Sequence, residues 1–268
     1  MSQNDGVGAL KSGRAAARAE LERPLPRKQI DGQTLHTRVL AQIRADIVTC
    51  RLMPNERLML ETLREKYRVG WSPIREALMR LAAEGMVALE QNKGFRVAPV
   101  SRESLLDLMQ SRIEIESVAL RWSIERGGVA WEAHLIAAFH RLSKQSKFSR
   151  TQPPTISPDW SREHSAFHRA LVAACESPTM LAIRESLFEK AERYVTLAIL
   201  AKSPARNDVA EHEQIMAAAL ARSVPRAVAA SRDHIERTCK KVAKSLENHP
   251  EFSRGRPVMR EPQIALAG

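Results

Sequence analysis

Apolar residues recur along most of this chain at spacings of three and four, the pattern of helices with one buried face. The first such pattern begins at Thr34 and ends before Pro54-Asn55, where these two residues favour a turn. It predicts a helix of about 16 residues. The apolar positions of this helix are Val39, Leu40, Ile43 and Ile47.

Two further helices are predicted between Asn55 and Gly85. The first is short, with apolar positions at Leu60, Leu63 and Tyr67. A tight turn at Val69-Gly70-Trp71 then leads to the second helix. Ser72 stands where the N-cap residue belongs, and Pro73 would take the first helical position. The buried face of this helix would consist of Ala77, Leu78, Leu81 and Ala82.

The hydrophobic period then changes from that of helices to that of strands. Residues 86–89 and 95–98 are short apolar runs on either side of the polar turn 91–94, which predicts a β-hairpin. The order is therefore helix, helix, turn, helix and hairpin within about 65 residues, which is the layout of a winged helix-turn-helix.

After Pro99 the chain is predicted to be helical. Ser101 can cap the first helix, and Gly127-Gly128 ends it. Helices are expected near residues 101–127, 131–148, 159–175, 178–202, 207–222 and 225–247. The fold class is therefore mainly α, an N-terminal winged helix-turn-helix with a small β-hairpin wing followed by an all-helical bundle of about six to seven helices.

These patterns divide the chain into four parts. Residues 1–28 form a flexible basic tail, 29–100 the winged helix-turn-helix, 101–248 the helical domain and 249–268 a C-terminal tail. The sequence contains no apolar run long enough to span a membrane and no apolar signal-peptide core near its start. We therefore expect a cytoplasmic protein without a membrane partner.

Composition and charge narrow the class of partner. The formal net charge of +11 favours a polyanion, nucleic acid first, although the excess is spread along the chain. Aromatic residues, at 4%, are too few for the stacking platforms of single-strand binders. The three cysteines are far apart, which argues against a disulfide framework. Neither GxGxxG nor GxxxxGK[ST] is present, so no phosphate-binding loop is predicted.

Residues 53–101 resemble the winged helix of GntR-family transcription regulators. The residues that carry the resemblance are Pro54, Leu58, Leu63, Val69, Ser72 to Leu78, Arg80-Leu81, Glu84-Gly85, Val87, Gly94 and Val97. The resemblance implies a homodimer that binds a pseudo-palindromic double-stranded DNA operator through two recognition helices. Arg75 can reach a phosphate or a guanine edge, and Lys93 and Arg96 lie in the wing. We expect DNA contacts from Trp71, Ser72, Pro73, Arg75, Arg80, Lys93, Gly94 and Arg96.

The chain departs from the family at the turn and on the preceding helix. Gly70 and Trp71 replace a polar residue followed by Arg, and Glu61 stands where some members have Arg. Two expected DNA-contacting groups are therefore missing, and Trp71 can either stack on sugar or a thymine methyl or simply cover the turn. Arg75 has an alternative role as the partner of Glu76 or Glu84.

Residues 101–246 resemble the FCD effector domain of the FadR-type GntR subfamily. The markers are the segment Leu108 to Glu116, the segment Ser165 to Leu171, Glu211-His212 and His234-Ile235. Four histidines on three predicted helices can converge in the core of such a bundle, namely His164, His168, His212 and His234. Neutral imidazoles suit Zn, Ni, Cu or Fe. The alternative is that these histidines lie on the surface or are satisfied core residues.

The resemblance also implies a ligand set and an effector. In metal-binding relatives the ligands are an Asp, a His four residues later and two further His. Here His164 takes the Asp position. The identity of the metal is therefore not fixed by the resemblance: we favour Zn, with Ni or Fe as alternatives. Arg112 can grip the carboxylate of a small organic acid beside the metal. Glu116, Arg193 and Arg184 are the other candidates for this pocket, and an Arg112–Glu116 pair on one helix is the structural alternative.

These inferences predict a ligand-responsive transcription regulator, a repressor, whose effector shifts the arrangement of its DNA-binding domains. One alternative is a metal-dependent enzyme built on the bundle. The residue after His164 is not the Glu that a zincin helix carries, so we do not expect an enzyme. The other alternative is a metal-free architectural DNA-binding protein.

Overall fold

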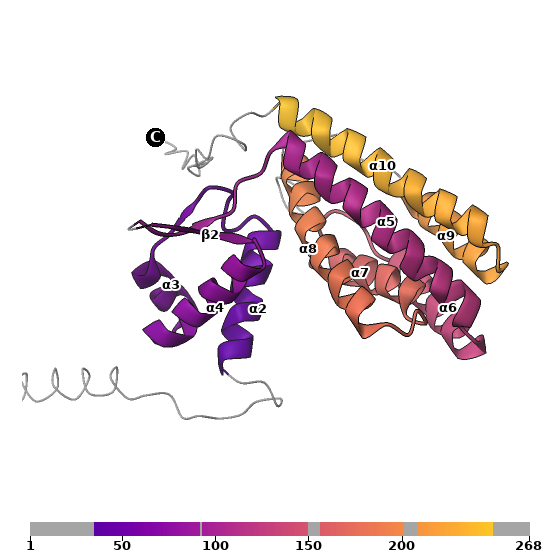
Figure 1. Cartoon of the computed structure of the whole chain (residues 1–268), viewed down its shortest axis with the longest axis horizontal. Helices are drawn as coiled ribbons and strands as arrows, with labels where there is room; N and C mark the ends of the chain where they lie inside the picture. The colour runs from indigo at the N-terminus through magenta and orange to yellow at the C-terminus, as the bar shows by residue number, and fades with distance from the viewer. Residues whose placement is uncertain (1–34, 92, 150–155, 201–207, 249–268) are drawn as a thin grey trace, which may run out of the picture.

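The computed structural model describes residues 35–91, 93–149, 156–200 and 208–248 of the chain, and it contains a winged-helix domain followed by a helical bundle (Figure 1). The tails expected at 1–28 and 249–268 lie outside the described residues. The last strand of the first domain ends at Val97 and the first helix of the bundle begins at Arg102. The predicted fold class, mainly α with a small β wing, is confirmed.

In the described part of the chain, the winged-helix domain contains three helices and a small sheet. The helices are α2 (Leu35–Val48), α3 (Leu60–Tyr67) and α4 (Trp71–Ala83), and the strands are β1 (Arg57–Leu58), β2 (Val87–Glu90) and β3 (Gly94–Val97). The sheet has the order β1-β3-β2 and is antiparallel, with Leu58 opposite Phe95 and Val87 opposite Val97. The predicted hairpin is therefore β2-β3, and β1 adds a third strand that the sequence pattern did not predict.

The start of α4 differs from the prediction. The helix begins at Trp71, and Gly70 is its N-cap with extended backbone. Ser72 is thus inside the first turn, where its hydroxyl donates to the Glu76 carboxylate at 2.7 Å instead of capping the helix. Pro73 is accommodated because the N–H groups of a first turn have no partner within the helix.

The core of the winged-helix domain is formed by the apolar faces that the spacing predicted. Its fully buried residues come from all three helices and from the sheet, and include Val39, Ile43, Ile47, Ile74, Leu78, Leu81 and Val97. Because α4 buries one face in this core, its opposite face remains on the surface and carries the exposed side chains of Ser72 and Arg75.

Six helices form the second domain within its described residues, in agreement with the bundle expected from the sequence. They are α5 (Arg102–Arg126), α6 (Val129–Ser143), α7 (Pro158–Val172), α8 (Pro178–Leu200), α9 (Val209–Leu220) and α10 (Val224–Asn248). Ser101 caps α5 as predicted, accepting a hydrogen bond from the Ser104 N–H at 3.1 Å. Gly127 ends α5, and a Cβ there would lie 2.5 Å from the Trp131 ring, so only glycine fits.

Helix α8 lies between the rest of the bundle and the winged-helix domain (Figure 1). Its Glu189 pairs with Arg44 of α2 at 2.9 Å. The Arg193 guanidinium donates to the carbonyls of Ala98 and Pro99, in the segment that joins the domains, at 3.2 and 3.1 Å. Helix α8 therefore contacts both the winged-helix domain and the segment that joins the two domains.

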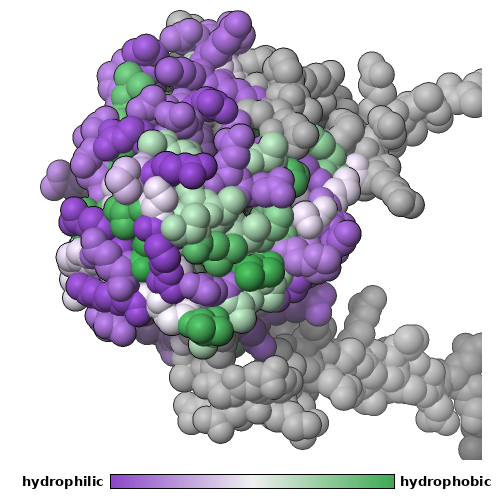
Figure 2. Space-filling model, turned by 90° about the vertical axis from the view of Figure 1, so that its right-hand side faces the viewer, coloured by the Kyte–Doolittle hydropathy of each residue, from purple (hydrophilic) through white to green (hydrophobic). Residues whose placement is uncertain are grey.

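The end of the bundle seen in Figure 2 carries a group of hydrophobic residues surrounded by hydrophilic ones. Helix α6 contributes to this end of the molecule (Figure 1), and its Val129 and Ile136 are exposed. Among the described residues, every helix is too short or too polar to cross a membrane.

Candidate functional site

Four histidines from three helices meet inside the bundle. His164 and His168 lie one turn apart on α7, His212 lies on α9 and His234 on α10, and all four are buried. We call these four residues the histidine cluster. The Nε2 atom of His168 lies 3.2 Å from His164 Nε2 and 3.3 Å from His212 Nε2. One nitrogen from each of the four rings lies within 4.8 Å of the others.

This arrangement fits a metal ion. Nitrogen ligands about 2.0–2.1 Å from a tetrahedral zinc ion are about 3.3–3.4 Å apart, which matches the two Nε2–Nε2 separations. The Glu211 carboxylate lies 2.9 Å from His234 Nδ1. Since a carboxylate accepts the Nδ1 proton, His234 Nε2 keeps its lone pair for a ligand.

The surroundings of His164 and His168 favour the neutral form of these two imidazoles. Burial first, and then the neighbouring imidazoles, lower the pKa of His164 and His168 well below the ordinary value. Trp160 stacks on the His164 ring with a centroid distance of 4.4 Å. Each of these two neutral rings therefore has one unprotonated nitrogen that can bind a metal.

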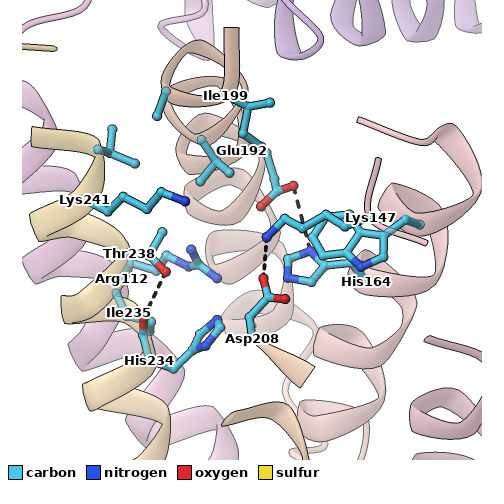
Figure 3. Close-up of a pocket in the computed structure, with 14 residues that line it drawn as sticks. Arg112, Lys147, His164, Glu192, Ile199, Asp208, His234, Ile235, Thr238 and Lys241 are labelled. Carbon is cyan, nitrogen blue, oxygen red and sulfur yellow. Dashed lines mark hydrogen bonds and ion pairs between the residues drawn. The ribbon is translucent and has the colours of Figure 1, made fainter. Parts of the chain in front are cut away.

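A cavity opens directly above His164 and His234 (Figure 3). One part of its wall is apolar, formed by side chains of α8 and α10 that include Val195, Ile199 and Val242. The polar part consists of Arg112, Lys147, Glu192, Asp208, Thr238 and Lys241. A small polar ligand in this cavity would touch the cluster at one end and charged side chains along its length.

Arg112 lies in the segment Leu108 to Glu116, one of the markers of the family resemblance. Its guanidinium is buried and faces the cavity (Figure 3). Its Nε donates to Glu116 at 3.2 Å, and Arg184 lies 3.2 Å from the same carboxylate oxygen. Both guanidiniums lie over the Phe188 ring, at 4.7 Å for Arg112 and 4.4 Å for Arg184. Burial alone would raise the pKa of Glu116, but the charges of Arg184 and Arg112 outweigh it and lower the pKa.

The exposed face of α4 is a candidate nucleic-acid interface. Arg75 is exposed and has no ion-pair partner within the part of the chain that the structure describes. Its two suggested partners are engaged elsewhere: Glu76 by His36 at 2.7 Å and Glu84 by Arg44 at 2.5 Å. The alternative role of Arg75 as a structural pair is therefore not observed, and its guanidinium is available to a phosphate or a base edge.

Comparison with known proteins bears on both regions. The family described as "Bacterial regulatory proteins, gntR family" matches residues 35–97, and the "FCD domain" family matches residues 107–237. The chain is 36% identical over 195 residues to BphR of Paraburkholderia xenovorans, an uncharacterized HTH-type transcriptional regulator. The aligned region covers 73% of this chain and 80% of that protein. The chain belongs to the GntR family of transcription regulators.

A second relative is the HTH-type transcriptional repressor GlaR of Escherichia coli, 35% identical over 72% of this chain and 89% of that protein. Among solved structures, Escherichia coli McbR/YncC shares the fold with a TM-score of 0.67 at 18% identity, over 79% of this chain and 98% of that one. This GntR-family chain thus has a DNA-binding domain and an FCD effector domain, and its relatives are regulators rather than enzymes.

Two residues expected at the effector pocket of this GntR-family protein lie outside the lining of the cavity. Arg193 does not line the cavity, because its guanidinium points the other way and binds the Ala98 and Pro99 carbonyls. Glu116 also lies outside the cavity lining and binds Arg112 and Arg184 from behind. Arg184, the further candidate, belongs to this same buried group and not to the lining.

Several cavity residues were not predicted from the sequence. Lys147 comes from the segment after α6 and Asp208 from the residue before α9, and they pair at 2.5 Å. Glu192 and Lys241 lie on predicted helices but matched no pattern that marks a pocket. Residues outside regular elements give no periodic signal, so only the folded chain shows that they reach the cluster.

On the DNA-binding face, the wing and the turn differ from the expectation in detail. Arg96 donates to Glu90 at 2.7 Å and to the Asn55 carbonyl at 2.5 Å. Of the three wing residues expected to contact DNA, Lys93 and Gly94 are the exposed ones. Arg64, which was not predicted, stacks over the exposed Trp71 ring at 5.1 Å. The same guanidinium is paired with Glu61 at 2.5 Å, so the stacked Arg64 lies beside the start of α4 as part of an ion pair. Pro73 is half-buried and Arg80 is exposed near Glu84.

Proposed function

We propose that this GntR-family regulator is a homodimeric repressor whose binding to a pseudo-palindromic operator is controlled by a small organic acid held at a metal centre. The observation that carries the proposal is the histidine cluster at the floor of a cavity that also presents the Arg112 guanidinium. The name of GlaR, a repressor 35% identical to this chain, supports the sign of regulation.

The metal we propose is zinc, with nickel or iron as alternatives, held by His164, His168, His212 and His234. Four imidazole nitrogens suit these ions far better than Ca²⁺ or Mg²⁺, which prefer oxygen. When bound, the ion would supply a Lewis-acidic position for one oxygen of the acid. The absence of a carboxylate from the cluster leaves the ion with its full positive charge, which favours an anionic ligand.

Arg112 would bind the carboxylate of that acid. Its Nε donates to Glu116, and its two terminal nitrogens make no hydrogen bond within the described residues. They are held in the cavity wall by the Phe188 contact and by the Glu116 bond. A planar guanidinium with two free nitrogens binds a carboxylate well, and the low exposure of Arg112 strengthens the interaction.

The domain that binds the acid is connected to the domain that binds DNA through α8. Glu192 of this helix lines the cavity, while the adjacent Arg193 binds the interdomain segment and Glu189 binds Arg44. A ligand that changes the position of α8 would change the relative arrangement of the two α4 helices in the dimer, and with it the fit to the operator half-sites. A near-complete switch requires about 5.5 kcal/mol of differential affinity.

Metal analysis tests the proposal. We expect the purified full-length protein, loaded with zinc and dialysed, to retain about one ion per chain. His212→Ala should lose the ion because three ligands remain around a partly opened site. His134→Ala, an exposed histidine of α6, is the matched control and should retain the ion. Wild-type protein that holds no zinc, nickel or iron after loading would contradict the proposal and favour an architectural DNA-binding protein.

A further inference from the structure

Glu192 places a carboxylate in the wall of a cavity that we propose binds a carboxylate. Figure 3 shows its side chain facing the guanidinium of Arg112 and the ammonium of Lys241 across the cavity. Within the described parts of the chain its ion-pair contact is with His164 Nδ1 at 3.9 Å, which is longer than a hydrogen bond. The carboxylate therefore has acceptor positions that face the cavity.

The neighbouring cations do not neutralise Glu192 by direct pairing. Lys147 is paired with Asp208 at 2.5 Å, and Arg112 is paired with Glu116. Burial raises the pKa of Glu192 above its ordinary value, and the charges of Arg112 and Lys147 limit this rise without reversing it. A second carboxylate entering the cavity would meet this group, and two buried carboxylates without a donor between them repel each other.

A hydrogen-bond donor on the ligand removes this conflict. A hydroxyl or ammonium group on the carbon next to the ligand carboxylate can donate to Glu192 while the carboxylate binds Arg112 and the metal. A charge-assisted hydrogen bond of this kind is short and strong in a buried site. A saturated acid without such a group would leave the Glu192 acceptors unpaired, which carries a desolvation cost.

We infer that Glu192 is a specificity-determining residue, and that the effector is an acid with a hydroxyl or ammonium donor beside a carboxylate rather than a plain mono- or dicarboxylic acid. The inference rests on the proposed effector site. It follows from the juxtaposition of an anionic acceptor, Glu192, with the cations Arg112 and Lys241 in one cavity.

The test is a binding comparison by calorimetry on zinc-loaded full-length protein. The ligands are matched sets of equal length: succinate, both enantiomers of malate, and aspartate; then glutarate, both enantiomers of 2-hydroxyglutarate, and glutamate. We expect at least one donor-bearing acid to bind about tenfold or more tightly than its plain counterpart, the size of one charge-assisted hydrogen bond. Malate against aspartate separates a hydroxyl from an ammonium donor.

Two variants make the test specific to Glu192. Glu192→Leu should reverse the order, because donor-bearing acids lose their acceptor whereas plain acids lose a repulsion. Glu125→Leu, which changes an exposed carboxylate of α5, is the matched control and should behave as wild type. Zinc affinity is measured for each variant, because a carboxylate that only orients His164 would change metal affinity and leave the ligand order intact.

Equal affinities for plain and donor-bearing acids in wild type would overturn the inference and leave the proposed acid site standing. An unchanged ligand order in Glu192→Leu, with or without weaker zinc binding, would also overturn it. If no acid of either set binds, the inference and the proposed class of effector fail together, while metal content and operator binding still report on the rest of the proposed function.

Discussion

At the scale of single residues, Glu116 determines how the cation of the effector cavity is presented. It is 5% exposed, accepts a hydrogen bond from Arg112 and forms an ion pair with Arg184, and both of these cations are themselves buried. The i, i+4 spacing on α5 was sufficient to predict the Arg112–Glu116 pair. The contribution of Arg184 was not predictable, because it depends on the packing of α8 against α5.

Replacing Glu116 should destabilise the protein strongly. Glu116→Gln leaves two buried guanidiniums without their shared anion, and breaking a buried pair by removing one partner costs about 3–5 kcal/mol. Denaturant unfolding monitored by circular dichroism measures this loss. Glu114→Gln breaks a surface pair with Arg232 and should change the unfolding free energy by less than about 1 kcal/mol. A loss of similar size in the two variants would show that the buried group does not stabilise the bundle.

The histidine cluster should make the metal-free protein sensitive to acid. Burial and the neighbouring imidazoles lower the pKa of His164 and His168 in the folded state, so the unfolded chain binds protons at a higher pH than the folded chain. Their contribution to stability is then complete above about pH 6.5, the unperturbed pKa of histidine, and is lost as the pH falls below it.

Unfolding of chelator-treated protein at pH 7.5, 6.5 and 5.5 measures this effect. We expect the free energy of unfolding to fall between pH 6.5 and 5.5, and to fall less in His168→Gln. The exposed residue His134 provides the control, since His134→Gln should follow wild type. A stability that is flat across this range, or equally steep in His168→Gln, would contradict neutral buried imidazoles.

At the scale of elements, the sequence pattern located the helices, but it did not show which face of α8 meets the cavity and which meets the interdomain segment. Glu192 and Arg193 are neighbours, about 100° apart around the helix axis, so one faces the cavity and the other the interdomain segment. Spacing along a helix fixes which residues share a face. It does not fix which neighbour that face packs against, and for this reason the sequence did not show that Arg193 faces the interdomain segment.

Two departures in the winged-helix domain have a similar origin. The strand β1 is two residues long, too short for an alternating pattern, and it forms only because β3 provides its hydrogen-bonding partner. The N-cap of α4 falls on Gly70 and not on Ser72 because α3 ends at Tyr67 and residues 68–70 already complete the turn, so α4 begins at Trp71. The buried faces of α2 and α4 were predictable because the amphipathic spacing persists over several turns.

The contact of Arg193 with the interdomain segment should transmit the effect of the ligand. Arg193→Ala removes both hydrogen bonds to the Ala98 and Pro99 carbonyls, so we expect operator affinity without acid to stay within about threefold of wild type, whereas the effect of acid on that affinity becomes smaller. Operator titrations by fluorescence anisotropy measure both quantities. Arg169→Ala, which breaks an exposed ion pair between Arg169 of α7 and Glu185 of α8, should respond to acid as wild type does. A full response in Arg193→Ala would exclude this contact from the coupling.

At the scale of the whole molecule, a groove-binding domain and a ligand-binding bundle meet at α8 (Figure 1). The net charge of +11 indicated a polyanionic partner but did not locate its site, because basic residues are distributed over both domains. The exposed face of α4, where Arg75 has no ion-pair partner in the described chain, is the position at which we expect the polyanion to bind. The four histidines were predictable as a set from the resemblance to metal-binding relatives, whereas the charged residues above them were not.

Operator binding in the presence and absence of acid tests the central claim most directly. The operator is selected from random duplex DNA with zinc-loaded full-length protein, and its affinity is measured with and without the tightest-binding acid. We predict that acid weakens operator binding of wild type by about tenfold or more, that His212→Ala binds the operator without responding to acid, and that Arg75→Ala loses the operator. Operator affinity that is independent of acid in wild type, or that falls equally in His212→Ala, would contradict the account.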